Sequence, residues 1–183
     1  MRRDDSPWRG DALDAPTRAR VSRRDVVGDV IAVFGVLAVL GVVCGVLWWL
    51  LVEPAEFTKL ADGGTMGEVE LSRRFDADGW YTVLAAVTGF LAGMVVTAWR
   101  DRDFWLTTLL LVPGAAAAAA LMAVVGGLLG PGDPDPALAA AQFGARVPEQ
   151  LMVTADAAYF AWPIAVLLGA LVVLWSAPND TTV

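Results

Sequence analysis

The sequence predicts an all-α integral membrane protein, built as a bundle of four membrane-spanning helices. Hydrophobic residues make up 57% of the 183 residues and charged residues 18%, whereas soluble domains average about 45–50% and about 25%. The apolar residues are concentrated in four blocks, each long enough for a helix to cross about 30 Å of hydrocarbon. The predicted spans are residues 31–52, 80–99, 104–130 and 155–176.

The N-terminal segment is highly charged and has no apolar periodicity, which predicts a disordered cytoplasmic tail over residues 1–25. A membrane domain follows over residues 26–177, and residues 178–183 form a short C-terminal tail. Arg23 and Arg24 partly match a twin-arginine export signal. The apolar run that follows is too long for a signal-peptide core and lacks a cleavage site, so we expect a retained anchor.

The distribution of Arg and Lys predicts the orientation of the helices. The tail and the hinge at residues 100–103 carry nine of these residues, whereas the two long loops carry four. We therefore expect both termini in the cytoplasm (N-in/C-in) and two extracytoplasmic loops. The predicted topology anchors are Arg23, Arg24, Arg100 and Arg102.

Aromatic residues near the ends of the spans favour the same orientation, because Trp and Tyr concentrate at membrane interfaces. The residues assigned to the outer interface are Trp48, Trp49, Trp80, Tyr81, Tyr159 and Trp162, and those assigned to the inner interface are Trp99, Trp105 and Trp175. The two signals predict one topology.

The first loop, residues 53–79, is strongly acidic. Its Asp62-Gly63-Gly64 turn signal and the alternating residues 68–71 favour a small hairpin, and Asp78 is placed to cap the second span. Asp76 and Asp78 also resemble part of a calcium loop, but an Arg occupies the position of the preceding ligand. Capping and turn formation are therefore the favoured interpretation, and no metal site is expected.

The second loop, residues 131–153, contains one helix signal. Asp133-Pro134 predicts the start of a short helix that continues through residues 137–143. This helix is expected on the membrane surface or over the bundle.

Small residues at a spacing of four mark the faces where the helices should pack, because close backbone approach drives association in lipid. Gly41 and Gly45 form one such pair, and Ala85, Gly89 and Gly93 begin a ladder in the second span. Packing within the bundle is the favoured interpretation and homodimerisation the alternative. The short hinge makes the second and third spans antiparallel neighbours, so we expect the glycine ladder to meet the alanine-rich third span.

Two prolines lie inside the spans. Pro113 is expected to kink the third span and to free the carbonyl of Leu109, and Pro163 is expected to act similarly in the fourth. The alternative interpretation is a broken helix that exposes carbonyls to a transported ligand.

Composition argues against several chemistries. With one Cys and no His, the chain cannot form an internal disulfide and has almost no ligands for zinc, haem or iron–sulfur clusters. No catalytic constellation is apparent, so neither an enzyme nor a cofactor is expected. The interiors of the spans carry no charge, which disfavours a proton-coupled transporter or a charge-lined channel. The basic residues of the tail are interleaved with Asp, so nucleic-acid binding is not expected.

A combination of motifs suggests a family. These are Gly41-xxx-Gly45-xx-Trp48, Phe75-x-x-Asp78-Gly79-Trp80, Gly89-xxx-Gly93 and Trp162-Pro163. Over roughly residues 27–176 the chain resembles a family of small four-span actinobacterial membrane proteins that is catalogued as a domain of unknown function. The resemblance implies a location in the bacterial cell membrane, and it implies no activity or site residues.

These observations predict a non-enzymatic accessory or interaction protein of the bacterial cell membrane. The expected partners are the lipid bilayer and either a second copy of the chain or another membrane protein. The alternative is a small transporter or lipid-handling subunit that uses the helix break at Pro113.

Overall fold

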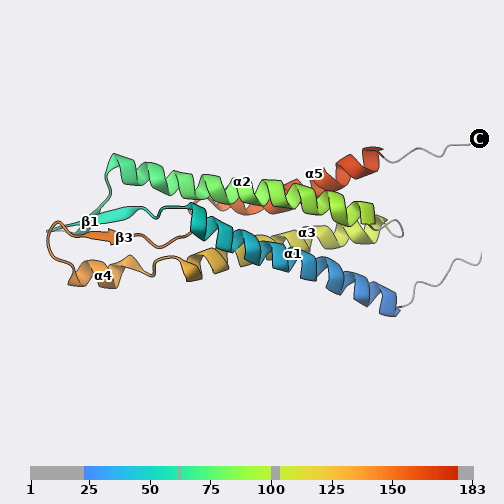
Figure 1. Cartoon of the computed structure of the whole chain (residues 1–183), viewed down its shortest axis with the longest axis horizontal. Helices are drawn as coiled ribbons and strands as arrows, with labels where there is room; N and C mark the ends of the chain where they lie inside the picture. The colour runs from blue at the N-terminus through green and yellow to red at the C-terminus, as the bar shows by residue number, and fades with distance from the viewer. Residues whose placement is uncertain (1–22, 62, 100–103, 177–183) are drawn as a thin grey trace, which may run out of the picture.

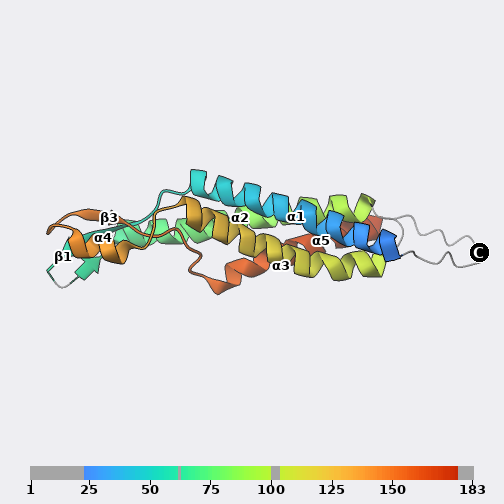
Figure 2. The same ribbon diagram turned by 90° about the horizontal axis from the view of Figure 1, so that it is seen from below.

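A computed structural model describes residues 23–61, 63–99 and 104–176. Four helices form an elongated bundle (Figures 1 and 2), and all four are long and apolar enough to cross a membrane. They are α1 (Arg23–Leu51), α2 (Glu68–Trp99), α3 (Phe104–Leu129) and α5 (Ala161–Ser176), the last preceded by the 3-10 helix η1 (Asp156–Phe160).

The bounds of these helices differ from the prediction mainly at their N-terminal ends. α2 begins at Glu68 rather than at Trp80, so the expectation that residues 68–71 form a strand is wrong. Glu, Leu and Arg in this stretch are good helix formers, and Glu68 and Glu70 in the first turn complement the helix dipole. α1 begins at Arg23, so the last residues of the predicted tail are helical.

The two long loops fold into one three-stranded antiparallel sheet of order β2-β1-β3. β1 (Glu56–Leu60) pairs with β2 (Gly63–Thr65) across the predicted turn and with β3 (Arg146–Pro148) from the other loop. Thr58 in β1 lies opposite Thr65 on one side and Arg146 on the other. Because β1 is the central strand, the sheet joins the first loop to the second.

The short helix α4 (Pro134–Ala140) begins where the sequence predicts. The Asp133 side chain caps it by accepting a hydrogen bond of 3.0 Å from the backbone N–H of Asp135. The strands and α4 extend beyond the ends of α1 and α3 (Figure 1). We call residues 52–79 and 130–155 the head.

The helices pack as two parallel pairs, α1 with α3 and α2 with α5. In the first pair, a Cβ built on Gly41 would lie 2.7 Å from the carbonyl oxygen of Ala118. A Cβ on Gly45 would lie 2.8 Å from that of Met122. These glycines therefore allow the two backbones to touch.

The second pair packs in the same way. A Cβ on Gly93 would collide with the backbone of Val166, and one on Gly169 with the backbone of Phe90, while Gly89 faces Trp162. Ala85, which lies in α2 with Gly89 and Gly93, is fully buried. Each helix of this pair thus places a glycine against the backbone of the other.

The expectation that the glycine ladder of α2 meets the alanine-rich α3 is therefore wrong. α2 and α3 make few contacts, whereas the alanine-rich stretch of α3 packs against Gly41 of α1 through the backbone of Ala118. The short hinge fixes the order and the antiparallel direction of α2 and α3. It does not determine which face of each helix is covered. The closest backbone approaches are between α1 and α3 and between α2 and α5. Both glycine faces are occupied within one chain.

The two prolines lie in continuous helices. α3 remains one helix through Pro113, and Leu109, whose carbonyl loses its donor, has a mostly exposed side chain. Pro163 lies in the first turn of α5, just after the chain changes from 3-10 to α-helix at Ala161. The predicted kinks at both positions stay predictions.

Candidate functional site at the base of the head

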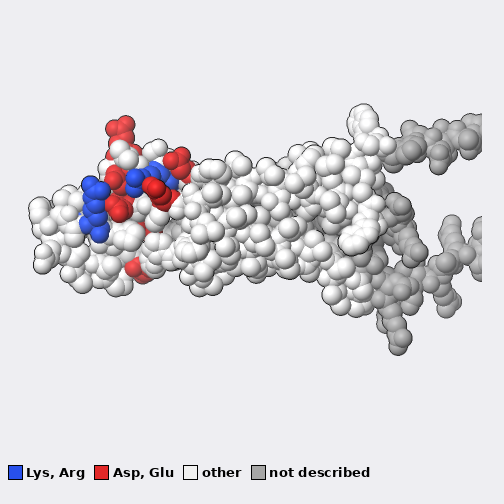
Figure 3. All heavy atoms as spheres, in the orientation of Figure 1, with Lys and Arg blue, Asp and Glu red and all other residues white. Residues whose placement is uncertain are grey.

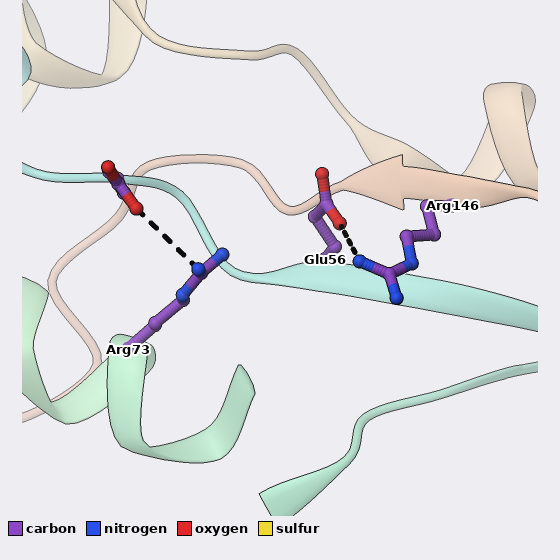
Figure 4. Close-up of polar contacts among 4 residues, drawn as sticks. Glu56, Arg73 and Arg146 are labelled. Carbon is purple, nitrogen blue, oxygen red and sulfur yellow. Dashed lines mark hydrogen bonds and ion pairs between the residues drawn. The ribbon is translucent and has the colours of Figure 1, made fainter. Parts of the chain in front are cut away.

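The charged side chains that the structure describes are gathered at the head, while the rest of the bundle is free of them in the same view (Figure 3). Two exposed ion pairs join separate segments of the head (Figure 4). Arg73 lies 3.6 Å from Glu53, and Arg146 lies 3.4 Å from Glu56. Exposed pairs of this kind contribute about 1 kcal/mol or less.

A third ion pair is buried where the two loops meet. Arg74 of α2 lies 2.6 Å from the carboxylate of Glu149, whose side chain is only 9% exposed. The backbone N–H of Glu149 donates to the carbonyl of Ala55 at 2.7 Å. Burial raises the pKa of Glu149, and the guanidinium of Arg74 offsets part of that rise. The pair thus links α2 to both loops.

The cleft around this pair is too small for a ligand. Arg73, Arg74, Glu149 and Thr154 line a cavity of about 10 Å³, which has room for no more than one water. Within the described residues, the Nε atom of Arg74 is buried without a hydrogen-bond partner. A water in the cleft is the partner that the geometry allows.

Asp78 has a different role from the one predicted. It lies inside α2 and does not cap it, because that helix begins at Glu68. Its two carboxylate oxygens accept hydrogen bonds from the backbone N–H groups of Thr154 at 2.9 Å and Ala155 at 3.0 Å. These amides directly precede η1, so Asp78 holds the segment that leads into this helix against α2.

This arrangement also argues against the calcium interpretation of the same segment. Asp76 is exposed, whereas Asp78 is 9% exposed and already paired with amides. Among the residues that the structure describes, no group of three or more Cys, Asp or Glu residues could hold a metal ion.

Two buried aromatic side chains, Trp48 and Tyr81, pack next to the Asp78 contact. The indole N–H of Trp48 donates to the carbonyl of Ala77 at 2.8 Å, and the hydroxyl of Tyr81 donates to that of Ala119 at 2.8 Å. The ring of Tyr81 contacts Trp48 edge-on, with centroids 5.3 Å apart, and contacts Tyr159 at 5.8 Å. These contacts tie α1, α2, α3 and η1 together.

Three of the six residues assigned to the outer aromatic girdle lie inside the bundle rather than on its surface. Trp48, Tyr81 and Trp162 are fully buried, whereas Trp49, Trp80 and Tyr159 are partly exposed. Buried Trp and Tyr side chains need a hydrogen-bond partner. The carbonyls of Ala77 and Ala119 and the sulfur of Met122 supply those partners.

A repeated sequence pattern marks this site. Ala-Asp-x-x-Tyr occurs at residues 77–81 and again at residues 155–159. The two tyrosines are in contact, and the aspartate of the first copy accepts from Ala155 of the second.

The structure does not bring the predicted topology anchors to this site. Arg23 and Arg24 begin α1 at the opposite end of the bundle, while Arg100 and Arg102 lie outside the described residues. Comparisons of the chain with protein-family models, curated proteins and solved structures find no match. The resemblance to the four-span family stays a prediction, and the function is argued from the chain's own contacts.

Replacing Asp78 with Ala is expected to lower the free energy of unfolding by about 1–3 kcal/mol, because two amides lose their acceptor. Asp76→Ala, which removes an exposed carboxylate from the same helix, is expected to change it by about 0.5 kcal/mol or less. Thermal unfolding in detergent, followed by circular dichroism, measures both. Equal effects of the two substitutions would contradict the assigned role.

Replacing Arg74 with Gln leaves the carboxylate of Glu149 buried without its cation. The cost of such a change is about 3–5 kcal/mol for a fully buried pair, and a smaller loss is expected because the Arg74 side chain is 35% exposed. Arg146→Gln, from an exposed pair, is the control and is expected to cost about 0.5 kcal/mol or less.

The loss in Arg74→Gln is expected to depend on pH. Without Arg74, the pKa of Glu149 rises further, so the folded protein holds the proton more tightly than the unfolded chain. The loss should be absent below the ordinary glutamate pKa of about 4.3 and should develop as the pH rises through the raised value. A loss that is constant with pH would exclude Glu149 as its cause.

Proposed function

We propose that the chain is a four-span integral protein of the bacterial cell membrane, with both termini in the cytoplasm and the head outside. Among the side chains that the structure describes, the charged ones lie at the head (Figure 3), which supports this placement because charge inside hydrocarbon is costly. The start of α1 and the end of α5 both lie at the end away from the head (Figures 1 and 2). The excess of Arg and Lys in the tail and hinge then orients the protein.

Within that placement, we propose a non-enzymatic accessory role in which the head is the contact surface for another membrane protein. One observation carries this proposal: the two loops share a sheet, a buried ion pair and the Asp78 contacts. These contacts give the acidic loops one defined surface. The glycine faces are used within the chain, so a second copy would have to bind elsewhere, which favours a different partner.

The transport alternative receives less support. Leu111 and Ala115, on either side of Pro113, are fully buried. One cavity lies at the Arg74–Glu149 pair, and a second lies where α1 and α3 meet the head. Neither cavity is lined by a residue between Thr108 and Pro113. A path through the bundle at this proline would therefore require a rearrangement of packed side chains.

Fusion of an enzyme that is active only outside the cytoplasm tests the orientation. Fusion after Gly64, in the hairpin, is expected to give activity, and fusion after Asp101, in the hinge, is expected to give none. The two fusions carry the same reporter, so each is the control for the other. Activity only at Asp101 would overturn the orientation.

Site-specific photo-crosslinking in intact cells tests the accessory role. Phe143 lies in the head and is 77% exposed, whereas Val95 lies in α2 and is 59% exposed. A photoreactive residue at position 143 is expected to give a discrete protein adduct, and a reactive residue in the identified partner should return the same adduct. At position 95 we expect lipid adducts. Protein adducts at neither position would contradict the accessory role.

A further inference from the structure

A partly open cavity of about 310 Å³ lies where α1 and α3 end. Its volume falls at the lower end of the range of small-molecule sites. The two helix ends lie side by side in both views (Figures 1 and 2). The last turn of α1 contributes Trp49 to the lining, and the last turn of α3 contributes Leu129. The rest of the lining consists of Val52, Pro54, Gly130, Pro131 and Leu151.

The lining contains no Asp or Glu, yet the two helix ends give it a negative electrostatic potential. Its side chains are apolar or aromatic, so apart from the indole N–H of Trp49 its polar atoms belong to the backbone. α1 and α3 are parallel, and each helix end carries about half a negative charge on its last carbonyls. The last turns of both helices contain no Lys or Arg.

Two prolines leave these helix ends short of hydrogen-bond donors. The N–H groups of Val52 and Gly130 reach back to the carbonyls of Trp48 and Gly126, at 3.1 and 2.9 Å. Pro54 follows Val52 by two residues and Pro131 directly follows Gly130. Neither proline has an N–H to donate. The ends of α1 and α3 therefore offer backbone carbonyls as acceptors beside the cavity, and its lining includes the indole ring of Trp49, a group that attracts cations.

We propose that this cavity binds the ammonium group of an ethanolamine phospholipid from the outer leaflet. A primary ammonium is a cation that donates hydrogen bonds to carbonyls, and its ethylene carbons suit the apolar walls. The inference rests on the proposed membrane placement, which puts the base of the head at the level of the lipid headgroups.

A neighbouring side chain favours a phospholipid over a free amine. Pro54 and Leu151 line both this cavity and the small cleft that contains Arg73. The Arg73 side chain is 39% exposed, and its one ion pair among the described residues is a long contact of 3.6 Å to the exposed Glu53. It is therefore available to a phosphate next to the bound ammonium.

Native mass spectrometry of the full chain, released from nanodiscs of equimolar phosphatidylethanolamine and phosphatidylglycerol, tests the proposal. The wild-type protein is expected to retain phosphatidylethanolamine in excess. Trp49→Leu should reduce that excess by about two- to fivefold, because the cation loses the indole face. Trp80→Leu is the matched control, since Trp80 is 44% exposed against 38% for Trp49 and does not line the cavity.

Retention of both lipids in the bulk ratio would overturn the proposal, as would equal effects of Trp49→Leu and Trp80→Leu. Displacement of the lipid by millimolar free ethanolamine would show that the amine alone is recognised and would overturn the assignment to a lipid. If Trp49→Leu does not fold, Leu129→Phe, which narrows the cavity, should also lower the excess. Correct reporter orientation without lipid preference would reject this inference and leave the placement intact.

Discussion

The carboxylate of Asp78 fixes how the two halves of the chain meet. A charge that is almost fully buried is tolerated only when hydrogen bonds replace its water, and the two amides before η1 do so here. The contact sets the position of η1, and therefore of α5, along α2. Gly93 and Gly169 then meet the opposing backbones at the heights where the missing Cβ atoms leave room. Tyr81, about one turn further along α2, donates its hydroxyl to the carbonyl of Ala119 and so fixes the position of α3 along α2.

The bundle and the head are held by different physics. Between the helices, the contacts are packed apolar side chains, close backbone approaches and a few hydrogen bonds from Trp, Tyr and Cys side chains. In the head, strand pairing and ion pairs join the loops. The Asp78 and aromatic contacts lie at the boundary between the two, where α2 passes from one environment into the other. A substitution at this boundary affects both regions.

Features governed by neighbouring residues were predictable from the sequence. The third helix, the turn at Gly63 and the cap at Asp133 all follow from local signals. Features governed by distant contacts were not. Trp48 and Trp49 are adjacent and chemically identical, yet only Trp48 is buried, because successive helical residues point about 100° apart. The role of Asp78 was missed because its partners lie in the other loop.

The parallel pairing of the helices has a consequence for synthesis. α1 and α2 leave the ribosome first, yet the partner of each belongs to the second half of the chain. Until that half is made, the glycine faces of both helices stay open and β1 lacks its β3 neighbour. The contacts between the paired helices therefore join residues far apart in sequence, an arrangement that slows folding. A chain truncated after α2 would lack the packing partner of each of its helices and the β3 strand of the sheet.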